Sequence, residues 1–242
     1  METMYISFVL PAYNEEMNVL PLLKRLTNSM KNITKNYEIL FVVEGNDNTL
    51  NILKKYKKEH PSMPLRYLYQ KEQLGLMNAF KKGYNNVSPK TTHIVSLDVD
   101  LNQSPEEMPR LIKKSKEGYD IVIGSRYVPN SKVKDVHLWR RALSRVGNIF
   151  FRIAFNIKVG DKTCAYRMID IRTIREIIPL VKSGGFEGLM EFILIANRKN
   201  KSIAEVPITM RLRKHGKSKL IVMKVFKGYF KLLMERSRIM SY

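Results

Sequence analysis

The sequence predicts an α/β fold built on a mainly parallel sheet with helices on both faces. Over about the first 127 residues, short apolar segments rich in β-branched and aromatic residues alternate with amphipathic segments of helical period. The strand segments are continuously apolar, as strands buried on both faces are. A hydrophobic content of 44% in 242 residues is ample for one core. No linker interrupts the sequence, so we expect one domain over 1–242, with a helical second half from about residue 128.

Each expected element follows from its residue pattern. Runs of Val, Ile, Leu, Phe and Tyr predict strands at 5–10, 37–43, 65–70, 93–97 and 120–125. Apolar residues three and four positions apart predict helices at 19–30, 49–59, 75–87 and 105–117. Pro21 and Pro105 stand near two helix starts, where a missing N–H breaks no helical hydrogen bond. After about Tyr127 the pattern is mainly helical, with a short strand near 202–208 and a long C-terminal helix from about Lys219.

The composition limits the classes of partner. Lys and Arg number 43 against 22 Asp and Glu, so the formal charge is +21 and the pI is about 10.0. This charge predicts an anionic partner. Nucleic acid, a phosphorylated small molecule and an acidic membrane surface all fit, and the charge alone does not choose among them. The single cysteine, Cys164, excludes an intramolecular disulfide and a multi-cysteine zinc site, which suits a reducing location.

The sequence predicts no transmembrane helix. Its longest run without a charged side chain is the twelve residues 3–14, whereas a membrane span needs roughly 18 apolar residues. No basic segment precedes an apolar one at the N-terminus, so a secretory signal is not expected. We therefore expect the protein to stay on the cytosolic side.

In open parallel sheets, ligands bind beyond the carboxyl ends of the strands. The loops there are expected at 11–16, 44–49, 98–103 and 125–130. In the third loop, Asp98 and Asp100 alternate with Val99, so the two carboxylates share a face. Such a pair suits Mg²⁺ or Mn²⁺, which take oxygen ligands and keep positions open for phosphate. The alternative is a solvated turn that caps the helix at Pro105, and these residues alone do not decide between the two.

Several motifs in order resemble one enzyme family. The strand ending in "PAYNEE" and the Asp98-Val99-Asp100 motif resemble the nucleotide loop and the metal-binding D-x-D of inverting family 2 glycosyltransferases. Further segments resemble the dolichol-phosphate mannose synthase-like branch: "GSRY" (124–127), "WRRALSRVGNIFFR" (139–152), "DKTCAYR" (161–167) and "EVPITMRLRKHGKSKL" (205–220). The resemblance covers about residues 5–220 and is specific to enzymes that act on polyprenyl phosphates. It implies a GT-A type fold with a Rossmann-like sheet.

The resemblance implies that the first two loops bind the donor nucleoside, although Tyr13 and Glu15 could instead cap the first helix. Two valines stand where many members have paired aspartates, so Glu44 or Asp47 would take over the nucleoside contact. That departure leaves guanine and uracil both open. The expected nucleotide-binding residues are Pro11, Tyr13, Glu15, Val43, Glu44, Asp47, Asp98 and Lys219.

The D-x-D motif would hold the metal. By resemblance, Asp98 and Asp100 bind Mg²⁺ or Mn²⁺ on the donor diphosphate, and Asn102 or Gln103 adds a ligand or orients one. The cation would neutralise charge on the departing nucleoside diphosphate, a Lewis-acid effect of several kcal/mol. The expected catalytic residues are Asp98, Asp100, Arg126 and Arg213.

Residues of the later motifs, most of them basic, would bind the acceptor phosphate. The planar fork of Arg pairs with two phosphate oxygens. The expected set is Arg126, Arg141, Arg167, Arg213, His215, Ser218 and Lys219. A phosphate monoester has a second pKa of about 6, so it is already an anionic nucleophile and needs no general base. The resemblance implies in-line attack on the anomeric carbon with inversion.

Two segments suit an acceptor that resides in a membrane. Residues 139–155 and 220–238 have amphipathic patterns, with Arg or Lys on one side and apolar residues on the other. Such helices can lie in a membrane interface or can bury their apolar face in the protein's own core, and the pattern leaves both open. We expect peripheral association with the cytosolic face of a membrane, alone or through a membrane partner subunit.

The leading hypothesis is metal-dependent transfer of a hexose, most simply mannose from GDP-mannose, to dolichyl or another polyprenyl phosphate. The alternative donor is a UDP-sugar such as UDP-glucose. Nucleic-acid binding is a remote alternative, because no aromatic base-stacking array accompanies the charge, so no nucleic-acid partner is expected. A silent tethering subunit is disfavoured, because the acidic pair and the basic segment 211–219 are both present.

Overall fold

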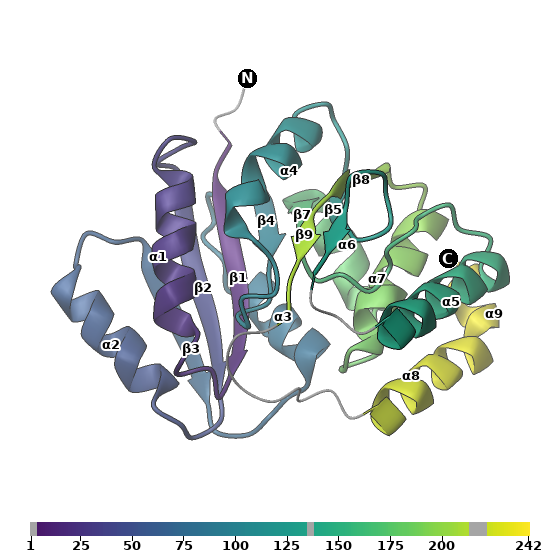
Figure 1. The fold of residues 1–242 in the computed structure, drawn as a ribbon, viewed down its shortest axis with the longest axis horizontal. Helices are drawn as coiled ribbons and strands as arrows, with labels where there is room; N and C mark the ends of the chain where they lie inside the picture. The colour runs from purple at the N-terminus through teal and green to yellow at the C-terminus, as the bar shows by residue number, and fades with distance from the viewer. Residues whose placement is uncertain (1–3, 135–137, 213–221) are drawn as a thin grey trace.

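The computed structural model describes residues 4–134, 138–212 and 222–242 (Figure 1). Its main sheet has seven strands, in chain order β1 (Ile6–Tyr13), β2 (Tyr37–Glu44), β3 (Leu65–Gln70), β4 (His93–Ser96), β5 (Ile121–Ser125), β7 (Arg167–Asp170) and β8 (Ile203–Pro207). Their order across the sheet is β3-β2-β1-β4-β7-β5-β8. A second, two-stranded sheet pairs β6 (Lys132–Val133) with β9 (Thr209–Met210) in parallel. The predicted α/β class is confirmed, as a mixed, mostly parallel sheet with helices.

β1 to β4 form a continuous parallel part of the sheet. β1 pairs in parallel with β2 and β4, and β2 pairs in parallel with β3. All five strands expected before residue 127 are present, and β8 confirms the strand expected near 202–208. In register, Tyr13 lies opposite Glu44, so the carboxyl ends of β1 and β2 meet at one edge.

The helices of the first half are α1 (Val19–Met30), α2 (Thr49–Glu59), α3 (Leu76–Tyr84) and α4 (Met108–Ser115), the last preceded by the 3₁₀ turn η1 (Pro105–Glu107). The crossovers from β1 to β3 run one way across the sheet and the crossover to β4 runs back, so right-handed connections place α3 opposite α1 and α2. α3 packs closely: a Cβ at Gly83 would lie 2.2 Å from Val9 Cγ1. Pro21 lies in the first turn of α1 and Pro105 opens η1, as expected.

β7 was not expected. This four-residue strand lies antiparallel between β4 and β5, whereas β5 and β8 are parallel to each other. Its segment "RMID" is too short to show a strand pattern. Because β7 joins β4 to β5, the second half of the chain continues the sheet of the first half.

The helices of the second half are α5 (Leu138–Ala154), α6 (Ile171–Ile177), α7 (Glu187–Arg198), α8 (Val222–Met234) and α9 (Arg236–Met240), with the 3₁₀ turn η2 (Ile178–Leu180) after α6. α7 is buried from Gly188 to Ala196, while α5, α8 and α9 lie together at one end of the molecule (Figure 1). The expectation of one long C-terminal helix is wrong, because two helices divide at Glu235, and its expected start at Lys219 lies outside the described residues. The division lets Arg238 of α9 bind the buried Glu191 of α7 at 2.6 Å.

Within residues 4–134, 138–212 and 222–242, no helix is long and apolar enough to cross a bilayer. α5, the longest, has 17 residues and carries several arginines.

Candidate active site

Two loops at the carboxyl edge of the sheet are joined through Asn14. This residue has a positive φ of 50°, and its Oδ1 accepts hydrogen bonds from the N–H groups of Asn46 (3.0 Å) and Asp47 (3.2 Å). Its own N–H donates to the carbonyl oxygen of Glu44 at 3.2 Å. Gly45 fits beside it only without a side chain, because a Cβ there would lie 2.1 Å from Asn14 Oδ1. The loops after β1 and β2 therefore form one unit.

The carboxylates of Asp47 and Glu15 take part in this unit. Asp47 Oδ2 accepts from the N–H of Glu16 at 3.1 Å, and Oδ1 accepts from the N–H of Thr49 at 3.0 Å. Thr49 Oγ1 in turn accepts from the N–H of Glu15 at 2.9 Å. Glu15 Oε2 accepts from Asn18 Nδ2 at 2.6 Å, just before α1. The Asp47 carboxylate links the two loops, whereas the Glu15 carboxylate binds the residue before α1. The contact of either acid with a nucleoside stays a prediction.

The other residues predicted to bind the nucleoside differ in burial. Pro11 and Tyr13 on β1 are partly exposed, whereas the Val43 side chain on β2 is 2% exposed and belongs to the hydrophobic core. The structure therefore does not bring the Val43 side chain to the surface. Glu44 is only 3% exposed, burial raises the pKa of its carboxyl, and its Oε1 accepts no hydrogen bond from the described residues. A buried acceptor in this place needs a donor.

Asp98 and Asp100 lie in the loop after β4, with Val99 buried between them. Gln103 Nε2 donates to Asp98 Oδ2 at 3.1 Å. The amide of Asn102 donates from Nδ2 to Asp100 Oδ2 at 2.8 Å, and the Asn102 N–H donates to Asp100 Oδ1 at 3.1 Å. Of the two roles expected for these amides, this geometry is that of orienting the carboxylates.

The donor atoms of this loop fit a hard divalent cation. Asp98 and Asp100 offer carboxylate oxygens, and the buried Oδ1 of Asn102 accepts no hydrogen bond from the described residues. Among those residues no cluster of three His, Cys, Asp or Glu is present. A cation held by two carboxylates would complete its shell with phosphate oxygens and water, which is the usual arrangement for Mg²⁺.

The D-x-D loop is attached to the segment that leads into the basic motif. Met210 of β9 forms an isolated bridge with Gln103, and the Arg211 N–H donates to the carbonyl oxygen of Asn102 at 2.9 Å. Met210 and Arg211 therefore lie beside the D-x-D loop, and Arg211 is the first residue of the basic segment 211–219. The predicted residues Arg213, His215, Ser218 and Lys219, and the side chain of Arg141, lie outside the described part of the chain.

Arg126 follows β5 and forms a buried ion pair with Asp161. Arg126 Nε donates to Asp161 Oδ2 and Nη2 donates to Oδ1, both at 2.7 Å. Burial opposes both charges, but each partner stabilises the other, so the pKa of Asp161 is lowered and that of Arg126 is raised well above its ordinary value. Cys164 Sγ connects this pair to the D-x-D loop, because Gln103 Nε2 lies 3.7 Å from it. The sequence indicated both residues of the pair but not their contact.

Arg167 lies inside the protein rather than at an acceptor surface. It is 2% exposed, and its Nη2 donates to the carbonyl oxygen of Lys162 at 2.7 Å. Arg167 is the first residue of β7, an inner strand between β4 and β5, so its side chain lies on a covered face of the sheet. The placement does not match the predicted contact with acceptor phosphate, and Arg167 instead supports the 161–167 loop from within.

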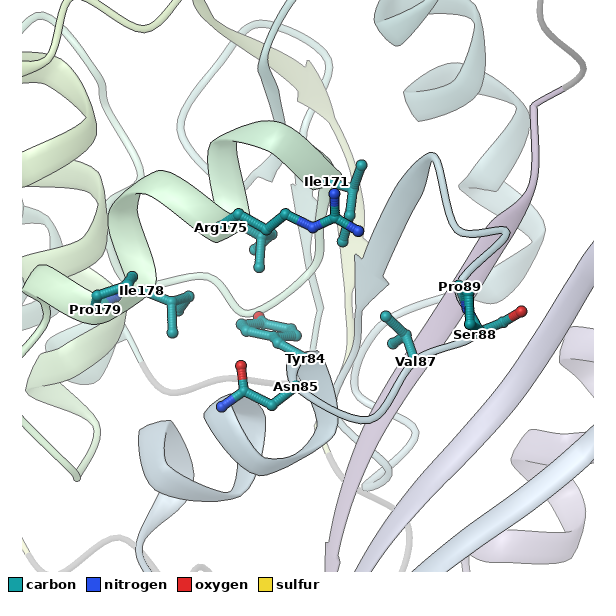
Figure 2. A pocket seen from close by; sticks show the side chains of 10 residues that line it. Tyr84, Asn85, Val87, Ser88, Pro89, Ile171, Arg175, Ile178 and Pro179 are labelled. Atoms are coloured by element: carbon teal, nitrogen blue, oxygen red, sulfur yellow. The ribbon is translucent and has the colours of Figure 1, made fainter.

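A pocket of about 290 Å³ lies away from the D-x-D loop, near the end of the sheet where β4 begins (Figure 2). Tyr84, Asn85 and Val87 line it from the end of α3 and the loop before β4, and Arg175 lines it from α6. None of the predicted site residues takes part. The chemistry-bearing side chains gather instead at the carboxyl edge.

Comparison with known proteins identifies the family. The model of the family described as "Glycosyl transferase family 2" matches residues 7–178, from β1 to the first residue of η2. The chain belongs to glycosyl transferase family 2. The resemblance seen in its motifs is therefore confirmed.

Two curated relatives of this family 2 chain have names that specify a polyprenyl-type phosphate. It is 34% identical to a dolichol-phosphate mannosyltransferase of Pyrococcus furiosus over 90% of this chain. It is 29% identical over 94% of this chain to an undecaprenyl-phosphate 4-deoxy-4-formamido-L-arabinose transferase of Serratia proteamaculans. The matched regions cover 59% and 66% of these relatives.

A solved structure gives the fold. The glucosyl-3-phosphoglycerate synthase of Mycobacterium tuberculosis, in complex with Mn²⁺, UDP and phosphoglyceric acid, matches with a TM-score of 0.67 at 15% identity. The match covers 98% of this chain and 78% of that one. At this identity the likeness shows the fold alone, and it agrees with the expected GT-A type.

Proposed function

We propose that this glycosyltransferase moves a hexose from a nucleotide sugar to a polyprenyl phosphate, with mannose from GDP-mannose and dolichyl phosphate as first candidates. The observation that carries the proposal is the D-x-D loop, whose two carboxylates are oriented by Asn102 and Gln103. Backbone contacts join the same loop to Met210 and Arg211. The proposed cation site for a diphosphate thus adjoins Arg211, where the basic segment 211–219 of the sequence begins. The names of both curated relatives support a lipid phosphate as acceptor.

The donor diphosphate binds at the metal loop in this proposal. Asp98 and Asp100 hold Mg²⁺ or Mn²⁺, with Gln103 and Asn102 fixing their orientation. The cation, when bound, supplies Lewis-acid neutralisation of the leaving nucleoside diphosphate. The Mn²⁺ in the matching solved structure supports this assignment, and the choice between the two metals is open to assay.

The acceptor binds from the basic side. An anionic oxygen of the lipid phosphate attacks the anomeric carbon, and the bond from that carbon to the diphosphate oxygen breaks with inversion. Because the phosphate is ionised at neutral pH, no side chain has to remove a proton. Arg126 and the motif residues Arg213, His215, Ser218 and Lys219 are the proposed phosphate contacts, with Arg141 on α5.

The donor base is the open part of the proposal. The orphan Oε1 of Glu44 supports a contact with a base N–H at the end of β2. Guanine and uracil both present such a group, so this oxygen does not separate GDP from UDP. The first choice of GDP-mannose rests on the mannosyltransferase relative, and a UDP-sugar such as UDP-glucose remains the alternative donor.

A surface for the membrane supports the lipid acceptor. Six exposed apolar side chains lie on α5 and α8, and we call them the α5–α8 face: Val146, Ile149, Phe150, Ile153, Phe230 and Met234. The two helices contact each other through Phe151 and Tyr229, whose ring centroids are 5.4 Å apart. Exposed Arg145, Arg152, Lys227 and Lys231 accompany the face. Exposed apolar residues with cations nearby suit an anionic membrane interface, at the cytosolic side.

A donor assay tests the proposal. The protein is incubated with Mn²⁺ and a polyprenyl phosphate, with labelled GDP-mannose in one reaction and labelled UDP-glucose in another. Label in the lipid product from GDP-mannose is expected. Label from UDP-glucose alone would contradict the mannose assignment and favour the alternative donor. If no sugar reaches the lipid from these two donors or from any other nucleotide sugar, the lipid acceptor is contradicted.

A further inference from the structure

Asp161 and Thr163 hold the side chain of Arg126 from one side. Besides the two bonds of the Arg126 fork to the carboxylate, the Arg126 N–H donates to Asp161 Oδ2 at 3.0 Å. Nη2 also donates to Thr163 Oγ1 at 2.6 Å. Nε and Nη2 are therefore both engaged by this short segment. Nη1 donates no hydrogen bond to the described residues.

The segment that holds Arg126 is itself held by other parts of the fold. Glu205 of β8 accepts from the N–H groups of Gly160 (2.7 Å) and Asp161 (2.9 Å). Asn148 of α5 accepts from the N–H of Lys162 at 3.2 Å. Arg167 of β7 donates to the Lys162 carbonyl oxygen. Three elements thus fix the backbone around Asp161 without any help from Arg126.

Asp161 is completely buried and would cost free energy if its charge were not matched. Its Oδ1 accepts from the N–H of Cys164 at 3.1 Å and from that of Thr163 at 3.3 Å, in addition to Arg126. A buried ion pair is weak evidence for stability, because desolvation offsets much of the attraction. What a rigidly mounted pair does supply is direction: the guanidinium can take only one orientation.

This orientation limits how Arg126 can bind an anion. Its fork faces Asp161, and only 16% of its side chain is exposed. The Arg126–Asp161 pair is neutral as a whole, so it offers a directed N–H rather than net positive charge. The net charge that attracts a phosphate dianion has to come from other basic residues, whereas Arg126 contributes geometry.

We propose that Asp161 and Thr163 are positioning residues that aim the Nη1 edge of Arg126 at the acceptor phosphate. The inference rests on the proposed function, because it takes Arg126 as a phosphate contact. Asp161 supplies the charge and two acceptor oxygens for the fork, and Thr163 supplies the hydroxyl that fixes Nη2. Neither residue touches the substrate itself.

The test uses three variants of the full chain and one matched control. Asp161→Asn removes the charge at nearly constant shape, Thr163→Val removes the hydroxyl isosterically, and Thr163→Ser keeps it. The control is Thr173→Val, a buried threonine of α6 whose hydroxyl donates to Asp120 at 3.4 Å. Equilibrium binding is measured with farnesyl phosphate as acceptor probe and, separately, with GDP and UDP in the presence of Mn²⁺.

Loss of an aligned charged hydrogen bond predicts that Asp161→Asn weakens farnesyl phosphate binding by about tenfold or more. Thr163→Val weakens it by roughly threefold or more, because one neutral acceptor is lost. Thr163→Ser and Thr173→Val bind it like the parent, and nucleotide binding is unchanged in all four. Unchanged probe binding in Asp161→Asn and Thr163→Val would overturn the inference. The inference would also be overturned if nucleotide affinity fell as much as probe affinity, or if Thr163→Ser bound the probe as weakly as Thr163→Val. Absence of probe binding by the parent protein would overturn it as well.

Sugar transfer is measured in parallel so that two failures can be told apart. A parent protein that binds farnesyl phosphate but transfers no sugar would contradict the proposed function. The binding series would still decide the positioning roles. A parent protein that transfers sugar, with variants that bind the probe normally and lose only thermal stability, would leave the function intact and reduce Asp161 to a structural residue.

Discussion

Gln103 and Asp98 exchange two hydrogen bonds. Gln103 Nε2 donates to Asp98 Oδ2 at 3.1 Å, and the Asp98 N–H donates to Gln103 Oε1 at 3.3 Å. Gln103 is buried, so water competes little for either bond. One carboxylate of the proposed metal site is therefore oriented by the protein itself.

Gln103→Ala removes this reciprocal pair and leaves both aspartates in place. The loss of a partner that orients a metal ligand typically weakens metal affinity by about 10- to 100-fold. We expect the Mn²⁺ concentration for half-maximal sugar transfer to rise by that factor, with activity largely restored at saturating Mn²⁺. The control is Gln73→Ala, because Gln73 is exposed. An unchanged Mn²⁺ requirement would show that Gln103 does not support the site.

Gly45→Ala tests the link between the first two loops. Gly45 (φ 94°) and Gly118 (φ 95°) share one backbone conformation, but an added Cβ meets Asn14 Oδ1 only at Gly45. Both substitutions cost roughly 1–2 kcal/mol of stability for a left-handed alanine. Gly45→Ala should cost about 1–3 kcal/mol more from overpacking and raise the KM for the donor. Urea unfolding and donor kinetics measure both, and equal effects of the two variants would count against the link.

Phe150→Ser combined with Ile153→Ser tests the α5–α8 face. The two side chains are 52% and 75% exposed, so thermal stability should change little. Loss of their apolar area should weaken binding to anionic phosphatidylglycerol vesicles by about tenfold or more. Met17→Ser, an exposed apolar residue in the loop before α1, serves as control. Vesicle co-sedimentation is the measurement. Undiminished vesicle binding would remove this face from the account, and binding only in the presence of a membrane protein would favour a partner subunit.

Lys162 makes stability depend on pH. It is fully buried, and burial lowers its pKa from 10.5 to about 8. Between these values the unfolded chain binds more protons than the folded one, so this residue's contribution to the free energy of unfolding rises with pH. Lys162→Met should therefore stabilise the protein most at pH 7, and its advantage over the parent should shrink toward pH 10. Urea unfolding at both pH values measures this, and an equal difference at both would contradict the shifted pKa.

The repeating part of the fold could be predicted from the sequence. β1 to β5 are continuous apolar runs between clear helical patterns, and such runs report burial directly. β7 could not be predicted, because a strand of four residues has no period and its pairing with β4 and β5 is set by tertiary contacts. The placement of Arg167 follows from β7, so the error in its predicted role has the same origin.

The site shows the same division. The D-x-D loop was found from the spacing of Asp98 and Asp100 within a set of motifs. The contact between Arg126 and Asp161 joins residues 35 positions apart, and no local sequence pattern predicts such a contact. Asn14 stands in the "PAYNEE" motif, but the sequence assigns it no role. Its positive φ and its hydrogen bonds to the second loop depend on the pairing of β1 with β2.

In the proposed function, Asp98 and Asp100 support metal-dependent sugar transfer to a polyprenyl phosphate. The direct measurement is the transfer rate from labelled donor to polyprenyl phosphate with Mn²⁺, with EDTA, and with Asp98→Asn or Asp100→Asn. Removing a Lewis-acid contribution of several kcal/mol predicts a loss of about 100-fold or more in each case. Both variants should remain folded, since amide and carboxylate have nearly the same shape. Folded variants that transfer sugar at the parent rate, or a parent rate unaffected by EDTA, would contradict the account.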